Sequence, residues 1–145
     1  MACAISFGDQ EVQLNNGQFS DLIDLVIAVA RGSASGPQEQ SFVAHMVHLS
    51  EKEFWPGRGI RIESDFPGLE EQKFWARLFL DTARAIFDRR VGKHEFAYWQ
   101  AERIWQACGT GKLFVEAVRT RDERWEADTH DARDFRSISS GVDPR

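Results

Sequence analysis

Three side chains that can bind a metal ion stand at intervals of three residues: His45, His48 and Glu51. Imidazole nitrogens and carboxylate oxygens are common ligands of zinc. On a helix, this spacing would place all three on one face. No cysteine and no Glu-x-x-His motif completes the group, which favours surface or partly buried histidines over a metal site. We therefore expect neither a metal ion nor another cofactor.

The run from Gly109 to Leu113 contains part of the pattern of a phosphate-binding loop. Such a loop needs a glycine five residues before its last glycine, and Ser or Thr after its lysine. Gln106 and Leu113 occupy those positions, and the preceding residues have a helical pattern. Two glycines inside a helix cost about 1 kcal/mol each relative to alanine. We therefore expect either a notch that receives a neighbouring backbone or large ring, or a kink.

Two glutamates seven residues apart, Glu95 and Glu102, could share a helix face, as general acid and base pairs sometimes do. Cys108 lies among small apolar residues with no histidine at helical spacing, so nothing marks it as a nucleophile. A solvated stripe of charge is the simpler interpretation. We predict no catalytic residue, and a small enzyme with a carboxylate site between long helices is the alternative.

Aromatic residues flanked by acids occupy residues 50–68, a long stretch without periodic structure. Long loops are often functional, and aromatic anchors ringed by charge are typical of protein-binding hot spots. The alternative is that the rings fold back onto the core. The sequence predicts a partner-binding surface made of Glu51, Glu53, Phe54, Trp55, Glu63, Asp65 and Phe66.

Residues 69–118 are expected to form the scaffold of the protein. Apolar residues at three- and four-residue intervals predict a helix in the first half: Trp75, Leu78, Phe79, Thr82, Ile86 and Val91. Gly92 is suited to end this helix, and a second helix is expected from about His94 to Val118. The two would form an antiparallel hairpin. A homodimer formed through this hairpin is a further possibility.

A small sheet is predicted near the amino terminus. Apolar and polar residues alternate over residues 2–14, which is the period of a strand, and Gly8 and Asp9 suit the turn of a hairpin. A lone hairpin is marginally stable. The alternation in residues 60–63 suggests a third strand beside it.

Two more helices are predicted between these strands. The first spans roughly residues 19–31, with Ser20 as its N-cap. The second spans about residues 37–50, although residues 42–47 also fit a strand. The fold class is therefore α+β: about four helices, including a long helical hairpin, with a small antiparallel hairpin or three-stranded sheet. We expect one domain over residues 1–136 and a disordered tail over residues 137–145.

The composition excludes some classes of function. A net charge of −5 argues against nucleic-acid binding, which needs a basic face. The longest apolar run, residues 25–30, is far shorter than the roughly 20 residues of a membrane span. Two cysteines are too few for a disulfide framework, and no secretion signal is recognisable. We expect a cytoplasmic protein that does not enter a membrane.

The acidic residues are concentrated in the first half of the chain. Residues 1–72 hold eleven acids and four bases, a net charge of −7, whereas residues 73–145 have a net charge of +2. Such asymmetry can steer a basic partner, or serve only solubility. In size, acidity and layout, the whole chain resembles small bacterial immunity proteins, which neutralise toxins by covering them. That resemblance transfers no site residue, and it implies a non-enzymatic binder whose acidic surface meets a basic toxin.

Overall fold

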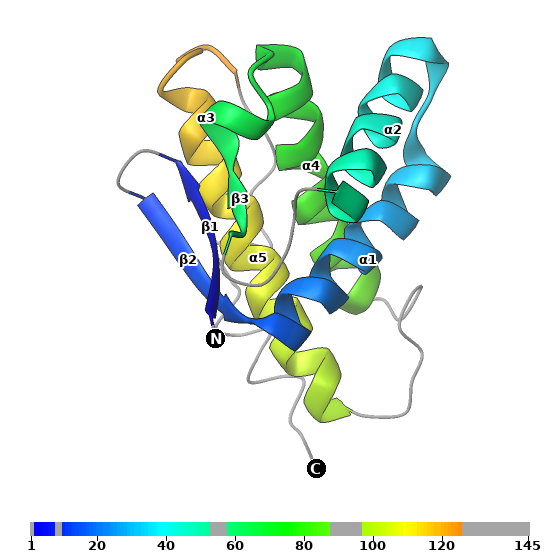
Figure 1. The fold of residues 1–145 in the computed structure, drawn as a ribbon, viewed down its shortest axis with the longest axis vertical. Coiled ribbons are helices and arrows are strands. Elements are labelled where there is room, and N and C mark those ends of the chain that lie inside the picture. The colour runs from blue at the N-terminus through cyan, green and yellow to red at the C-terminus, as the bar shows by residue number, and fades with distance from the viewer. Residues whose placement is uncertain (1, 8–9, 53–57, 88–96, 126–145) are drawn as a thin grey trace.

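The computed structural model describes residues 2–7, 10–52, 58–87 and 97–125. These residues form a mainly helical α+β fold, which confirms the predicted class. The sheet lies at one side of the molecule, and α1 and α2 lie at the other (Figure 1). The elements are β1 (Ala2–Phe7), β2 (Gln10–Asn15), α1 (Asn16–Ser33), α2 (Gly36–Lys52), β3 (Ile60–Arg61), α3 (Ile62–Asp65), α4 (Leu69–Phe87) and α5 (Ala97–Arg119).

The predicted hairpin is confirmed. β1 and β2 pair antiparallel, with Ile5 opposite Val12. Alternation buries Cys3, Ile5 and Leu14 in the core, because both strands contact α5. The predicted turn residues and the predicted tail of residues 137–145 lie outside the described part of the chain.

The third strand exists, but its direction differs from the prediction. β3 pairs with β1 in parallel, with Ile5 opposite Ile60, so the sheet has the order β2–β1–β3 and is mixed rather than antiparallel. Parallel strands need a long connection, and α1 and α2 supply it. The strand also ends at Arg61, because residues 62–65 turn into the one-turn helix α3.

α1 begins earlier than predicted. Asn15 Oδ1 accepts a hydrogen bond from the Gln18 backbone N–H at 2.8 Å, and Gln18 Oε1 accepts one from the Asn15 N–H at 2.9 Å. This reciprocal pair is a capping box. The prediction of Ser20 as the N-cap is therefore wrong, and Ser20 lies within the helix.

None of the described helices has the length and apolar character needed to cross a bilayer.

The structure resolves the ambiguity over the second helical segment. α2 is helical throughout, from Gly36 to Lys52. Val43, Met46 and Leu49 are buried at three-residue intervals, which is the period of a helix face. Phe42, partly buried, lies against Phe74 of α4 with ring centroids 5.5 Å apart.

α4 and α5 lie side by side and antiparallel in the centre of the molecule (Figure 1). The predicted apolar face of α4 is buried from Trp75 to Ile86. Phe79 of α4 stacks on Phe114 of α5 with ring centroids 4.5 Å apart. The predicted break at Gly92 lies outside the described residues.

The small residues of α5 form a notch, as predicted. A Cβ at Gly111 would lie 2.9 Å from Leu80 Cδ2 and 3.0 Å from the Leu80 backbone nitrogen. The backbones of α4 and α5 therefore approach closely at this point. A Cβ at Gly109 would meet nothing within 4 Å, so only one of the two glycines is required by packing.

This difference makes opposite predictions for two alanine substitutions in one helix. Gly111→Ala is expected to destabilise the protein by about 1–2 kcal/mol, because steric overlap exceeds the gain in helix propensity. Gly109→Ala is expected to stabilise it by about 0.5–1 kcal/mol, because it gains propensity without a clash. Urea unfolding of both variants measures the difference. Equal stabilisation by both would show that the helices do not meet at Gly111.

An ion pair ties the residues after α5 to the start of α4. Lys73 Nζ lies 2.9 Å from Asp122 Oδ2 and 3.7 Å from Glu70 Oε1. The hydrogen bond between Lys73 and Asp122 raises the pKa of the lysine and lowers the pKa of the carboxyl. Both shifts favour the charged forms.

Candidate functional site

The predicted binding surface over residues 50–68 is wrong for Phe66. This side chain is fully buried. It stacks on Trp75 with ring centroids 6.0 Å apart, and it also contacts Phe114 and His45. α3 turns the chain so that Phe66 enters the core beside α4. The alternative interpretation, in which the ring folds back onto the core, is correct for this residue.

Asp65 is also unavailable to a partner. Its carboxylate accepts hydrogen bonds from Arg58 at 2.7 and 3.3 Å, and from the Arg61 backbone N–H at 2.8 Å. The side chain is almost entirely buried. This bidentate pair holds residues 58–65 in place and has a structural role. The sequence predicts Asp65 as part of a partner-binding surface, but Arg58 and the Arg61 backbone occupy its carboxylate oxygens.

The remaining members of the predicted surface are divided. Glu51 and Glu63 are exposed, on α2 and α3 respectively. Glu53, Phe54 and Trp55 lie outside the described residues. Glu51 and Glu63 therefore stay candidates, whereas the buried Phe66 does not.

The histidines of α2 differ in their surroundings. His45 Nδ1 lies 2.6 Å from Glu71 Oε2, which links α2 to α4, whereas His48 is exposed. No cluster of three potential metal ligands occurs among the described side chains.

The phosphate-loop pattern of residues 109–113 lies inside α5, where the backbone is helical. The predicted carboxylate pair and thiol lie outside the part of the chain that the structure describes: Glu95 entirely, and Glu102 and Cys108 in their side chains.

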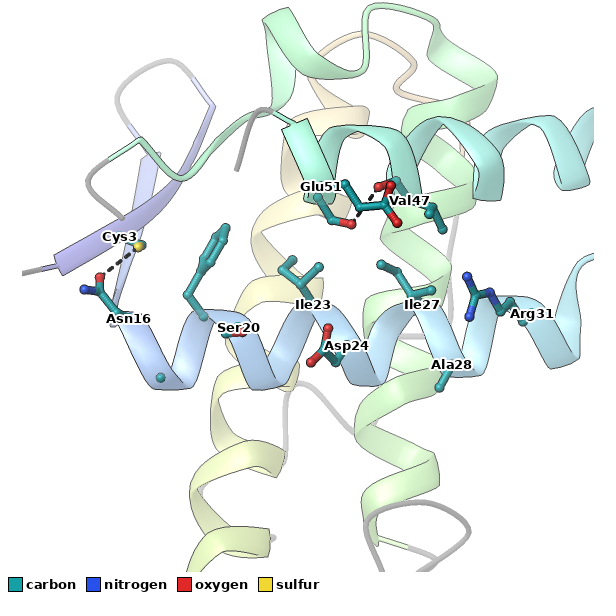
Figure 2. Close-up of a pocket in the computed structure, with 13 residues that line it drawn as sticks. Cys3, Asn16, Ser20, Ile23, Asp24, Ile27, Ala28, Arg31, Val47 and Glu51 are labelled. Carbon is teal, nitrogen blue, oxygen red and sulfur yellow. Dashed lines mark hydrogen bonds between the residues drawn. The ribbon is translucent and has the colours of Figure 1, made fainter. Parts of the chain in front are cut away.

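A groove of about 800 Å³ lies along α1 and beside the end of α2. We call it the α1 groove. Its apolar lining comes from Phe19, Ile23, Ile27 and Val47, and its polar lining from Asn16, Ser20, Asp24, Arg31, Ser50 and Glu51, with Gly17, Ala28 and Cys3 completing it. Figure 2 shows Ile23 and Ile27 directed from α1 toward α2, from which Val47 and Glu51 point back.

The sequence of α1 explains why a groove forms here. Half of the residues of this helix are apolar, and its core-facing residues are buried. Ser20, Asp24 and Ala28 repeat at four-residue intervals on the exposed side. Small side chains at Ser20 and Ala28 leave space above the helix. At one end of the groove, the Cys3 thiol donates a hydrogen bond to Asn16 Oδ1 at 3.2 Å, which joins α1 to β1.

The charged side chains of the α1 groove are exposed and unpaired. Asp24 from α1 and Glu51 from α2 contribute carboxylates, and Arg31 contributes a cation near the other end. None of the three has an ion-pair or hydrogen-bond partner within the described part of the chain. Opposite charges from a partner could therefore bind here without first breaking an internal pair.

The side chains described in the α1 groove are suited to binding more than to catalysis. Its described lining includes no histidine, and its thiol, Cys3, is buried and donates to an amide oxygen. An apolar floor with a few placed charges is typical of a recognition site. The sequence reasoning missed Asp24 and Arg31. Their local signal was a row of small or polar residues at positions 20, 24 and 28, with Arg31 about one turn further on.

Comparisons with protein-family models, with curated proteins and with solved structures find no match.

Proposed function

We propose that the protein is a small acidic binding protein that holds a basic partner protein, such as a toxin that it inhibits, against the α1 groove. One observation carries this proposal: Asp24 and Glu51 present exposed carboxylates, without an ion-pair partner among the described side chains, beside the apolar floor formed by Ile23, Ile27 and Val47. The groove lies within the half of the chain that has a net charge of −7.

The two parts of the groove have separate physical roles. Ile23 and Ile27 are already buried, at 3% and 9% exposure, so a partner that covers the floor removes mainly the exposed part of Val47 from water, at roughly 25 cal/mol for each Å² buried. The carboxylates attract a basic surface during approach and raise the association rate. The proposed surface therefore leaves out Asp65 and Phe66, which are buried. Glu51 belongs to both the predicted surface and the α1 groove, and it lies two residues before Glu53 in the sequence.

The partner can be found by crosslinking from inside the groove. A photoreactive amino acid replaces Ala28, an exposed lining residue, and in a matched control it replaces Ala44, which is exposed on α2 but does not line the groove. In source cells, position 28 is expected to capture a basic protein that position 44 does not. A protein captured equally from both positions would argue against the groove.

Charge reversal then tests the role of the acids. The Asp24→Lys/Glu51→Lys variant is expected to weaken binding of the captured partner by about tenfold or more, mainly through the association rate. The control variant, Glu11→Lys/Glu116→Lys, has the same change in net charge at exposed acids outside the groove. Surface plasmon resonance at several salt concentrations measures both. If the control weakens binding as strongly, the effect belongs to net charge and the α1 groove is not the site.

A further inference from the structure

We infer that the α1 groove receives an amphipathic helix of the partner that carries a basic residue and, two helical turns away, an acidic one. This inference rests on the proposed function and specifies its ligand. It depends on the shape of the groove, on the backbone groups that line it, and on the order of its charges.

The shape of the groove matches a helix. Its α1 lining runs from Asn16 to Arg31, which is about 22 Å at 1.5 Å per residue. Ser20, Asp24 and Ala28 form a ridge at four-residue intervals, the kind of row that packs into the grooves of another helix. Small side chains at two of these three positions permit a close approach.

The main-chain groups that line the groove favour a helical ligand over an extended one. The described lining comes almost wholly from α1 and α2, where the N–H and C=O groups away from the helix ends form hydrogen bonds within their own helices. A bound strand would therefore find few main-chain partners, whereas strand addition depends on such bonds. A helix satisfies its own backbone and needs only side-chain contacts.

The charges of the groove have opposite signs along its length. Asp24 and Arg31 are seven residues apart on α1, which is about 10 Å along the axis. Glu51 of α2 lines the same groove and adds a second carboxylate. A partner helix lying along α1 can place residues seven apart beside Asp24 and Arg31. The first should be basic and the second acidic.

The test uses four helical peptides of fifteen residues with the same leucine face. They differ only at two positions seven residues apart: Lys/Glu, Lys/Lys, Glu/Glu and Gln/Gln. Fluorescence anisotropy measures their binding to the full chain. The Lys/Glu peptide is expected to bind about fivefold more tightly than Lys/Lys, as exposed ion pairs are worth up to about 1 kcal/mol. A helix can lie in either direction, so the composition of the pair matters and not its order.

Variants of the protein give the sharper readout. Arg31→Glu is expected to reverse the preference, so that Lys/Lys binds more tightly than Lys/Glu. Ala28→Trp should abolish binding by filling the groove, and the control Ala44→Trp should leave it unchanged.

Three results would overturn the inference: no binding of any peptide, equal binding of all four, or a preference for Lys/Lys in the unaltered protein. The last result leaves the proposed function standing, since a purely basic ligand would still be captured at position 28. Failure of the crosslinking and charge-reversal experiments, in contrast, removes the proposed function itself.

Discussion

Phe66→Ala is expected to lower the free energy of unfolding by about 3–5 kcal/mol, the cost of removing a large ring from a close-packed core. Phe66 is fully buried between Trp75, Phe114 and His45. The backbone carbonyl of the same residue accepts a hydrogen bond from the buried Gln72 side chain. Loss of the ring therefore leaves a cavity where α3, α4 and α5 meet. Urea unfolding followed by tryptophan fluorescence measures the change.

Phe42→Ala is the matched control for this substitution. Phe42 has the same ring, is only partly buried, and has one described ring neighbour, Phe74. Its loss is expected to cost less, about 1–2 kcal/mol, because less apolar surface returns to water. If the two variants are equally stable, Phe66 is not in the core. A binding role for Phe66 would show instead as lost affinity at unchanged stability.

Gly59→Ala is expected to destabilise the protein by about 2–5 kcal/mol, combining left-handed backbone strain with steric overlap. Gly59 is buried with φ +70°, a conformation that residues with a Cβ rarely adopt. An added Cβ would overlap the carbonyl oxygen of Ala4 and lie 2.8 Å from its backbone nitrogen. The only relief is to move β3 away from β1, which breaks the pairing of Ile5 with Ile60.

Gly36→Ala is a control that separates backbone strain from steric overlap as causes of the destabilisation by Gly59→Ala. Gly36 has φ +78°, close to that of Gly59, but a Cβ there would meet nothing within 4 Å. This control should cost only the backbone strain, about 1–2 kcal/mol. Hydrogen exchange at the backbone amides of β1 and β3 would show whether β3 has detached in Gly59→Ala. Equal costs for the two variants would mean that β1 and β3 do not approach closely at Gly59.

The elements that could be predicted are those whose sequence has a clear period. Alternation in residues 2–14 predicted the hairpin, and the three- and four-residue spacing from Trp75 to Ile86 predicted α4. The glycine notch was also foreseeable, because a glycine inside a helix has a cost that close packing can offset. In each case the signal is local.

The errors fall where the outcome depends on distant contacts. Residues 50–68 have no period, and burial of Phe66 depends on Trp75 and Phe114, which come from other helices. The parallel direction of β3 depends on the route taken by α1 and α2. The α1 groove was missed because its described lining comes mainly from two helices. The small or polar residues at positions 20, 24 and 28 are equally compatible with a plain exposed face.

The order of the sheet has a consequence for protein synthesis. β1 lies in the middle of the sheet although it is the first described element to be translated. One edge of β1 pairs at once with β2, but the partner of the other edge is Ile60, fifty-five positions later. Until the ribosome has released that segment, the nascent chain presents an open strand edge, which is a template for pairing with other chains. Slow translation of the codons for α1 and α2 should therefore increase aggregation of the newly made protein.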